Sequence, residues 1–174
     1  IEAYPEIGNI AVVVMAKVVD AERSISVSLE SIRKQFYAAS EVYVLGSNRV
    51  ERDKESGTVT WLSESSAGDN LLNTVISQTS ASYLLVMQAG DELLPHTLLL
   101  LAEYRLRFPS ARAFYFDESI IKDGKAENPI LKPECNIDML RSYPYIGRSV
   151  ALDIAGLHQV GMATTTGCYL ELYD

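Results

Sequence analysis

Short apolar runs and amphipathic stretches alternate along the first two thirds of the chain. Uninterrupted apolar runs are typical of strands covered on both faces, and they lie at 10–15, 42–45 and 83–87. A further strand is predicted at 58–62. Apolar residues at helical spacing predict helices at 21–36, from Asp69 to Thr79 and from Pro95 to Phe108. Parallel neighbours require crossover connections, so this alternation predicts an α/β fold with a mostly parallel central sheet and helices on both faces.

The first predicted helix has a clear apolar stripe and a cap. Asp20 stands where an N-cap is expected. The spacing i, i+4, i+7 and i+11 places four residues on the buried face, namely Ile25, Leu29, Ile32 and Phe36. Asp69 and Pro95 mark the starts of the next two helices, and Pro109 ends the last of them.

The last third of the chain has shorter patterns. A strand is predicted at 113–116, and Asp123-Gly124 is a tight-turn signal. Asn136 can cap a short helix through Met139 and Leu140. Residues 130–132 are expected to be extended, and helical pieces are expected at 150–157 and 165–174. No repeat or linker interrupts 1–174, so we expect a single domain that belongs to a longer protein.

The stretch from Tyr83 to His96, YLLVMQAGDELLPH, joins the central apolar strand to a helix through an acidic turn. In open α/β sheets ligands bind outside the carboxyl ends of the strands, so Asp91 and Glu92 are candidate binding residues. Acidic residues here also stabilise the N-terminus of the following helix. An ordinary strand-to-helix loop is therefore the alternative.

Composition and charge exclude several classes of protein. The 174 residues are 48% hydrophobic and 22% charged, which suits one domain with a core. The net charge of −8 and the scattered Lys and Arg argue against nucleic-acid binding. The longest apolar run, 10–15, is too short to span a bilayer. Four residues lack the spacing of a disulfide framework or a zinc site and are interpreted as packing or surface positions: Cys135, Cys168, His96 and His158.

Several segments, taken in order, resemble the family 2 glycosyltransferases, which have the nucleotide-diphosphosugar fold called GT-A. They are SLESIRKQFYAASEVYVLGS from Ser28 to Ser47, Asn73 in the second helix, YLLVMQAGDELLPHTL from Tyr83 to Leu98, and FYFDESIIKDGKAENPILKPECNIDML from Phe114 to Leu140. The last segment is similar to a subgroup of bacterial polysaccharide-assembly transferases, in which a Tyr/Phe-rich strand ends in Asp-Glu and a Lys-Pro precedes a short helix. The order and spacing of the segments carry the resemblance.

The resemblance implies a three-layer GT-A fold, here C-terminally truncated, and a sugar-transfer reaction. A nucleotide-diphosphate sugar is the implied donor, and a glycan or another hydroxyl compound is the acceptor. Mn²⁺ or Mg²⁺ held by an Asp-X-Asp turn would neutralise the leaving diphosphate, because carboxylate oxygens suit hard cations. In inverting members a further carboxylate takes the proton of the attacking hydroxyl. The resemblance also implies a cytoplasmic location, including the inner face of the membrane, and other domains of the parent chain as partners.

This chain departs from the family where the chemistry resides. The Asp-X-Asp positions fall on 88–90, QAG, which leaves Asp91 and Glu92 directly after them. The second strand, which ends in paired aspartates in the family, ends here in LGS with Ser47 as its last residue. The stretch that corresponds to the family's acidic motif for the catalytic base contains Glu171.

These considerations define a candidate site. Donor contacts are expected from Asp91, Glu92, Gln88, Asn73, Ser47 and Lys132, metal contacts from Asp91, Asp117 and Glu118, and catalysis from Glu171. Each group has a plainer alternative. Asp117 and Glu118 can be solvated hairpin acids, Lys132 a surface lysine, Asn73 a satisfied polar residue and Asp69 a helix cap. Trp61 and the ten tyrosines can stack on sugars, although buried aromatic residues usually belong to the core.

Two functions remain open at this point. The first is a sugar transferase that uses Asp91, with Asp117 or Glu118, around a metal and the donor diphosphate. The second is a catalytically degenerate GT-A-like module that keeps the scaffold and serves as an interaction or acceptor-positioning domain, because a fold does not by itself imply a function.

Overall fold

The computed structural model describes residues 8–16, 22–46, 59–63, 71–147 and 149–160. Within them, six strands form one sheet in the order β3-β2-β1-β4-β8-β5. They are β1 (Ile10–Met15), β2 (Glu41–Leu45), β3 (Val59–Leu62), β4 (Tyr83–Gln88), β5 (Ala113–Tyr115) and β8 (Val150–Asp153). The pairs β1-β2, β1-β4 and β2-β3 are parallel, whereas β8 pairs antiparallel with β4 and β5. The prediction of a mostly parallel sheet is confirmed.

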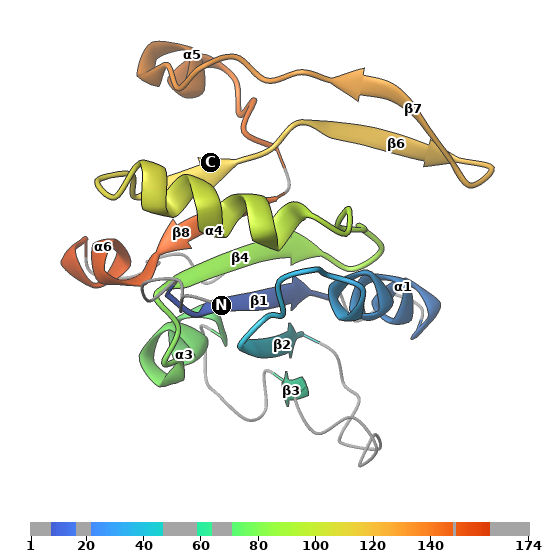
Figure 1. The fold of residues 1–174 in the computed structure, drawn as a ribbon, viewed down its shortest axis with the longest axis horizontal. Coiled ribbons are helices and arrows are strands. Elements are labelled where there is room, and N and C mark those ends of the chain that lie inside the picture. The colour runs from blue at the N-terminus through green and yellow to red at the C-terminus, as the bar shows by residue number, and fades with distance from the viewer. Residues whose placement is uncertain (1–7, 17–21, 47–58, 64–70, 148, 161–174) are drawn as a thin grey trace, which may run out of the picture.

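Helices cover both faces of this sheet, as the alternation of elements predicts (Figure 1). Helices α1 (Glu22–Arg33) and α4 (Thr97–Arg107) pack on one face, and α3 (Leu71–Gln78) and α6 (Ile154–Gln159) pack on the other. Successive side chains of a strand point to opposite faces. In β4, Leu85 and Met87 therefore join the core under α1 and α4, while Leu84 and Val86 join the core under α3 and α6. The result is a three-layer arrangement with β4 fully buried.

A two-stranded hairpin follows β5 and lies at the edge of the molecule with α5 (Ile137–Ser142), far from β3 in Figure 1. Its strands are β6 (Glu118–Lys122) and β7 (Lys125–Ile130). The predicted tight turn is confirmed, because Asp123 and Gly124 have φ of 51° and 74°. Asn136 caps α5 as expected, since its side chain accepts a hydrogen bond from the Met139 amide at 2.9 Å.

Two local predictions were wrong. Residues 150–153 form strand β8 rather than the start of a helix, because pairing with β4 and β5 buries Val150 and Ala151. The helix begins only at Ile154, where the Asp153 side chain accepts a hydrogen bond from the Gly156 amide. Phe36 does not join the core and is 75% exposed, because α1 ends at Arg33. The expected caps Asp20 and Asp69 and the expected helix at 165–174 lie outside the described residues.

Candidate functional site

The turn after β4 is held against α1 by two serine side chains. Ser28 accepts a hydrogen bond from the Gly90 amide at 2.9 Å and donates one to the Asp91 carbonyl at 2.8 Å. Ser31 accepts from the Leu93 amide at 3.1 Å. Both serines are buried on the apolar side of α1. The sequence analysis did not identify these serines. Two polar residues on the apolar face of a predicted helix could have indicated a buried hydrogen-bonding role. The acidic turn is therefore fixed in place by side chains about sixty residues earlier in the chain.

Asp91 closes this turn on itself. Its Oδ2 accepts a hydrogen bond from the Gln88 amide at 3.3 Å, and its own amide donates to the Gln88 carbonyl at 3.1 Å. Gly90 between them has φ of +96°, a conformation that other residues adopt only with strain. Glu92, the neighbouring candidate, is exposed to solvent. The structure thus places Asp91 at the predicted ligand-binding edge of the sheet, but in contact with the backbone of its own turn.

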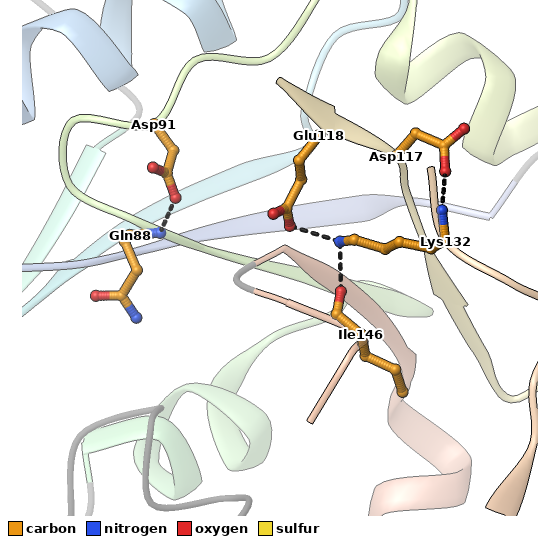
Figure 2. Close-up of polar contacts among 6 residues, drawn as sticks. All are labelled: Gln88, Asp91, Asp117, Glu118, Lys132 and Ile146. Carbon is orange, nitrogen blue, oxygen red and sulfur yellow. Dashed lines mark hydrogen bonds and ion pairs between the residues drawn. The ribbon is translucent and has the colours of Figure 1, made fainter. Parts of the chain in front are cut away.

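The Gln88 side chain is buried at the carboxyl end of the central strand. The residue is only 6% exposed, and its amide nitrogen Nε2 has no hydrogen-bond partner. By strand alternation it shares the α3 face of the sheet with Leu84 and Val86. Figure 2 shows its amide group on the opposite side of β4 from the Asp91 carboxylate. Gln88 and Asp91 therefore present different chemistry to the two faces of the sheet.

Three other candidates, Asp117, Glu118 and Lys132, come together at the base of the hairpin (Figure 2). The Lys132 ammonium lies 2.6 Å from Glu118 Oε1 and donates to the Ile146 carbonyl at 2.5 Å. The Lys132 side chain is 3% exposed, so its charge is almost entirely removed from water and depends on these partners. Asp117 Oδ1 accepts a hydrogen bond from the Lys132 amide at 2.8 Å. The sequence anticipated the residues but not the ion pair.

Gly147 allows this ion pair to form. It has φ of +82°, and a Cβ there would lie 2.6 Å from both Glu118 Oε1 and Lys132 Nζ. The ion pair therefore packs directly on the main chain that leads into β8. It connects the hairpin to the segment that precedes β8.

The carboxylates that the sequence proposed as metal ligands do not form a metal-binding set. Each is engaged elsewhere: Asp91 with the Gln88 amide, Asp117 with the Lys132 amide and Glu118 with the Lys132 ammonium. No group of three or more His, Cys, Asp or Glu residues suited to a metal ion occurs in the described part of the chain. Hard divalent cations require several oxygen ligands. The described residues at the end of β4 therefore do not fit such an ion.

The remaining candidates are less informative. Asn73 lies half-buried on α3, and Ser47 and Glu171 lie outside the described residues. Trp61 packs against the core under α1 and α4, which agrees with its structural interpretation. His96, His158 and Cys135 are exposed. Among the described residues no helix has the length and apolar character needed to cross a membrane.

Two tyrosines hold the segment between the hairpin and α5. Tyr115 donates a hydrogen bond to the Pro133 carbonyl at 2.6 Å, and the Tyr145 hydroxyl accepts one from the Asn136 amide at 2.8 Å. Their rings meet edge to face with centroids 6.0 Å apart. These two aromatic side chains support the backbone beside Lys132, and their hydroxyl groups are used within the protein.

No protein-family model matches the chain, and no curated protein matches it by sequence. Solved structures do match. Residues 1–349 of TarS from S. aureus align over 91% of this chain and 50% of that chain, with a TM-score of 0.64 and 15% identity. The same TarS segment in complex with UDP-GlcNAc aligns over 87% and 47%, with a TM-score of 0.62 and 17% identity.

A second protein gives a similar result. The mannosyltransferase PcManGT from Pyrobaculum calidifontis, in complex with GDP-Man and Mn²⁺, aligns over 92% of this chain and 50% of that chain, with a TM-score of 0.59 and 15% identity. The chain thus spans about half the length of these structures. At such identities the likeness shows the fold, which is the GT-A fold of nucleotide-sugar transferases.

Proposed function

We propose that this chain binds a nucleotide-diphosphate sugar at the carboxyl edge of β1, β2 and β4 and acts as a glycosyltransferase-type domain. The sugar passes to a hydroxyl group of a glycan or another acceptor. The GT-A fold supports this proposal, because ligands in open α/β sheets bind outside the carboxyl ends of the strands. The structural neighbours contain UDP-GlcNAc and GDP-Man. We extend the proposal to bacterial polysaccharide synthesis by a family 2 enzyme, on the cytoplasmic side and near the inner face of the membrane.

The observation that carries the proposal is the Gln88–Asp91 turn. It lies at the carboxyl end of the central strand, and Ser28 and Ser31 of α1 hold it rigidly. A preorganised turn with a buried unpaired donor is suited to binding, because the ligand supplies the missing partner. Asn73, Ser47, Glu92 and Lys132 remain predicted donor contacts.

The proposed reaction is a displacement at the anomeric carbon of the donor sugar. The acceptor oxygen forms a bond to this carbon, while the bond from the carbon to the diphosphate oxygen breaks and the nucleotide diphosphate leaves. A carboxylate takes the proton of the acceptor hydroxyl. Glu171 is the predicted base.

Ligand-dependent thermal unfolding tests this function. The purified chain is heated with UDP, GDP, UDP-GlcNAc and GDP-Man, each with Mn²⁺ and with EDTA. A ligand at about a hundred times its Kd adds roughly 2.7 kcal/mol to the stability, which raises the Tm by several degrees. The Asp91→Asn variant keeps an oxygen for the Gln88 backbone N–H but removes the charge of a predicted donor contact, so it is expected to weaken binding without disrupting the turn. Glu103→Gln, on the exposed side of α4, is the matched control.

A second candidate function is the catalytically degenerate module. It is favoured by the loss of the Asp-X-Asp carboxylates and by the engagement of Asp91, Asp117 and Glu118 within the protein. In that case the chain neither hydrolyses nor transfers sugar from UDP-GlcNAc or GDP-Man, with or without Mn²⁺. Product release that is abolished by Asp91→Asn but not by Glu103→Gln excludes the degenerate module.

A further inference from the structure

We propose that the nucleotide diphosphate binds at this site without a divalent cation, and that the Gln88 amide donates a hydrogen bond to one of its oxygens. This inference rests on the proposed function and specifies how the site recognises its ligand. It concerns Gln88, which stands at the first of the three positions that correspond to Asp-X-Asp.

The buried amide of Gln88 needs an acceptor that the protein does not supply. Its backbone is fully used, since the Gln88 backbone N–H donates to Asp91 Oδ2 and the Gln88 backbone carbonyl accepts from the Asp91 backbone N–H. The side-chain Nε2 is buried and lacks a partner, within a residue that is 6% exposed. An unpaired buried donor destabilises the unliganded protein, and an incoming oxygen atom that accepts its hydrogen bond removes this cost.

The side chain of Gln88 is a poor substitute for a metal-binding carboxylate. A hard cation is bound by several oxygen atoms, preferably charged ones, whereas Gln88 offers one neutral carbonyl oxygen beside its NH₂ group. The third of the Asp-X-Asp positions is Gly90, which has no side chain to offer. The carboxylate of Asp91, directly after this turn, lies on the other side of β4 and accepts a hydrogen bond from the turn's own backbone (Figure 2). The site thus has a neutral amide at a position where a metal-dependent enzyme needs a carboxylate.

The replacement of the Asp-X-Asp positions by Gln88, Ala89 and Gly90 involves the backbone as well as the side chains. The φ of +96° at Gly90 closes the turn, and an aspartate at this position, as a second metal ligand, is strained in that backbone conformation. The turn is therefore built for glycine.

The experiment measures nucleotide affinity by isothermal titration calorimetry on the full 174-residue chain. UDP and GDP are titrated in EDTA and in Mn²⁺. We expect one of them to bind in EDTA with a Kd within about threefold of its Kd in Mn²⁺. Binding that appears only with Mn²⁺ overturns the inference and leaves the proposed function intact. Failure of both nucleotides under both conditions overturns the proposed function, and the inference with it.

The Gln88→Leu variant separates ligand recognition from a structural role. Leucine has a similar volume and removes the unpaired donor, so the Tm without ligand is expected to stay the same or rise. The Kd for the bound nucleotide in EDTA is expected to increase about tenfold or more, the usual consequence of losing one hydrogen bond to a charged acceptor. An unchanged Kd, or a lower Tm without ligand, overturns the role of the amide. If Gln88→Leu does not fold, the comparison of EDTA with Mn²⁺ on the native chain still tests the inference.

Discussion

Lys132 and Glu118 form an ion pair, 2.6 Å from Nζ to Oε1, that joins the end of the hairpin to its beginning and to the Ile146 carbonyl. The lysine side chain is 3% exposed and the glutamate side chain 27%. The pair lies among the residues that the sequence assigned to phosphate and metal binding. Lys132 and Glu118 neutralise each other's charge within the protein. The ion pair therefore serves mainly to hold the hairpin in position.

Removal of the lysine charge is expected to destabilise the domain. Lys132→Met removes the hydrogen bonds that Lys132 donates to Glu118 and to the Ile146 carbonyl, which costs about 1–3 kcal/mol. Lys122→Met, on the exposed strand β6, is the matched control and should change the stability by about 0.5 kcal/mol or less. Urea denaturation of both variants measures the difference. Equal stabilities of the two variants contradict a structural role for the ion pair.

A methyl group on Gly46 is expected to disrupt the carboxyl edge of the sheet. Gly46 has φ of +83°, and a Cβ there would lie 2.3 Å from the backbone oxygen of Ala16. Gly124 has a similar φ of +74° but nothing within 4 Å, so Gly124→Ala measures the conformational cost alone. We expect about 1–2 kcal/mol for Gly124→Ala, and about 1–3 kcal/mol more for Gly46→Ala because of overpacking. Chemical denaturation checks both values, and similar losses in the two variants are inconsistent with the close approach.

Acid is expected to weaken the contact between β2 and the end of α3. Burial raises the pKa of Glu41, but hydrogen bonds from Ser80, Tyr43 and Thr79 outweigh it and hold the pKa below its usual value of 4.5. The carboxylate therefore stabilises the fold above pH 4.5, and this contribution is lost as the pH falls through the lowered pKa. Glu41→Gln should flatten the decline of stability with pH in this range.

Urea midpoints for the native chain and Glu41→Gln, measured from neutral pH down to about pH 3, test this expectation. Glu103→Gln serves as the control, because Glu103 is exposed on α4. Parallel curves for the native chain and Glu41→Gln rule out this contribution.

Alkali is expected to act on the same cluster through Tyr43. Burial, together with the hydrogen bond to Glu41 at 2.5 Å, raises the pKa of Tyr43 to about 12. A raised pKa in the folded state means that the contribution is complete below about pH 10 and is lost as the pH rises toward about 12. Tyr43→Phe should therefore lose less stability than the native chain over this interval. Tyr104→Phe, on the exposed side of α4, should behave like the native chain in the same denaturation series.

Local patterns were sufficient for much of the architecture. The runs at 10–15 and 83–87 became strands β1 and β4 because a chain covered on both faces must be apolar at every position. The Asn136 cap and the Asp123-Gly124 turn were predictable because each depends on a few neighbouring residues. Strand β8 was not predicted, since Val150 and Ala151 are buried by strands that lie far away in the sequence.

The sequence by itself determined the α/β class, the order of the main elements and the place of the acidic turn at the edge of the sheet. These follow from periodicity and from capping, which are properties of short segments. Only the tertiary structure decided which polar atoms form hydrogen bonds or ion pairs within the protein. Ser28 holds the turn and Glu118 neutralises Lys132. The side-chain amide nitrogen of Gln88 remains buried without a partner. Contacts between distant residues decide whether a polar group is satisfied, and no local pattern contains that information.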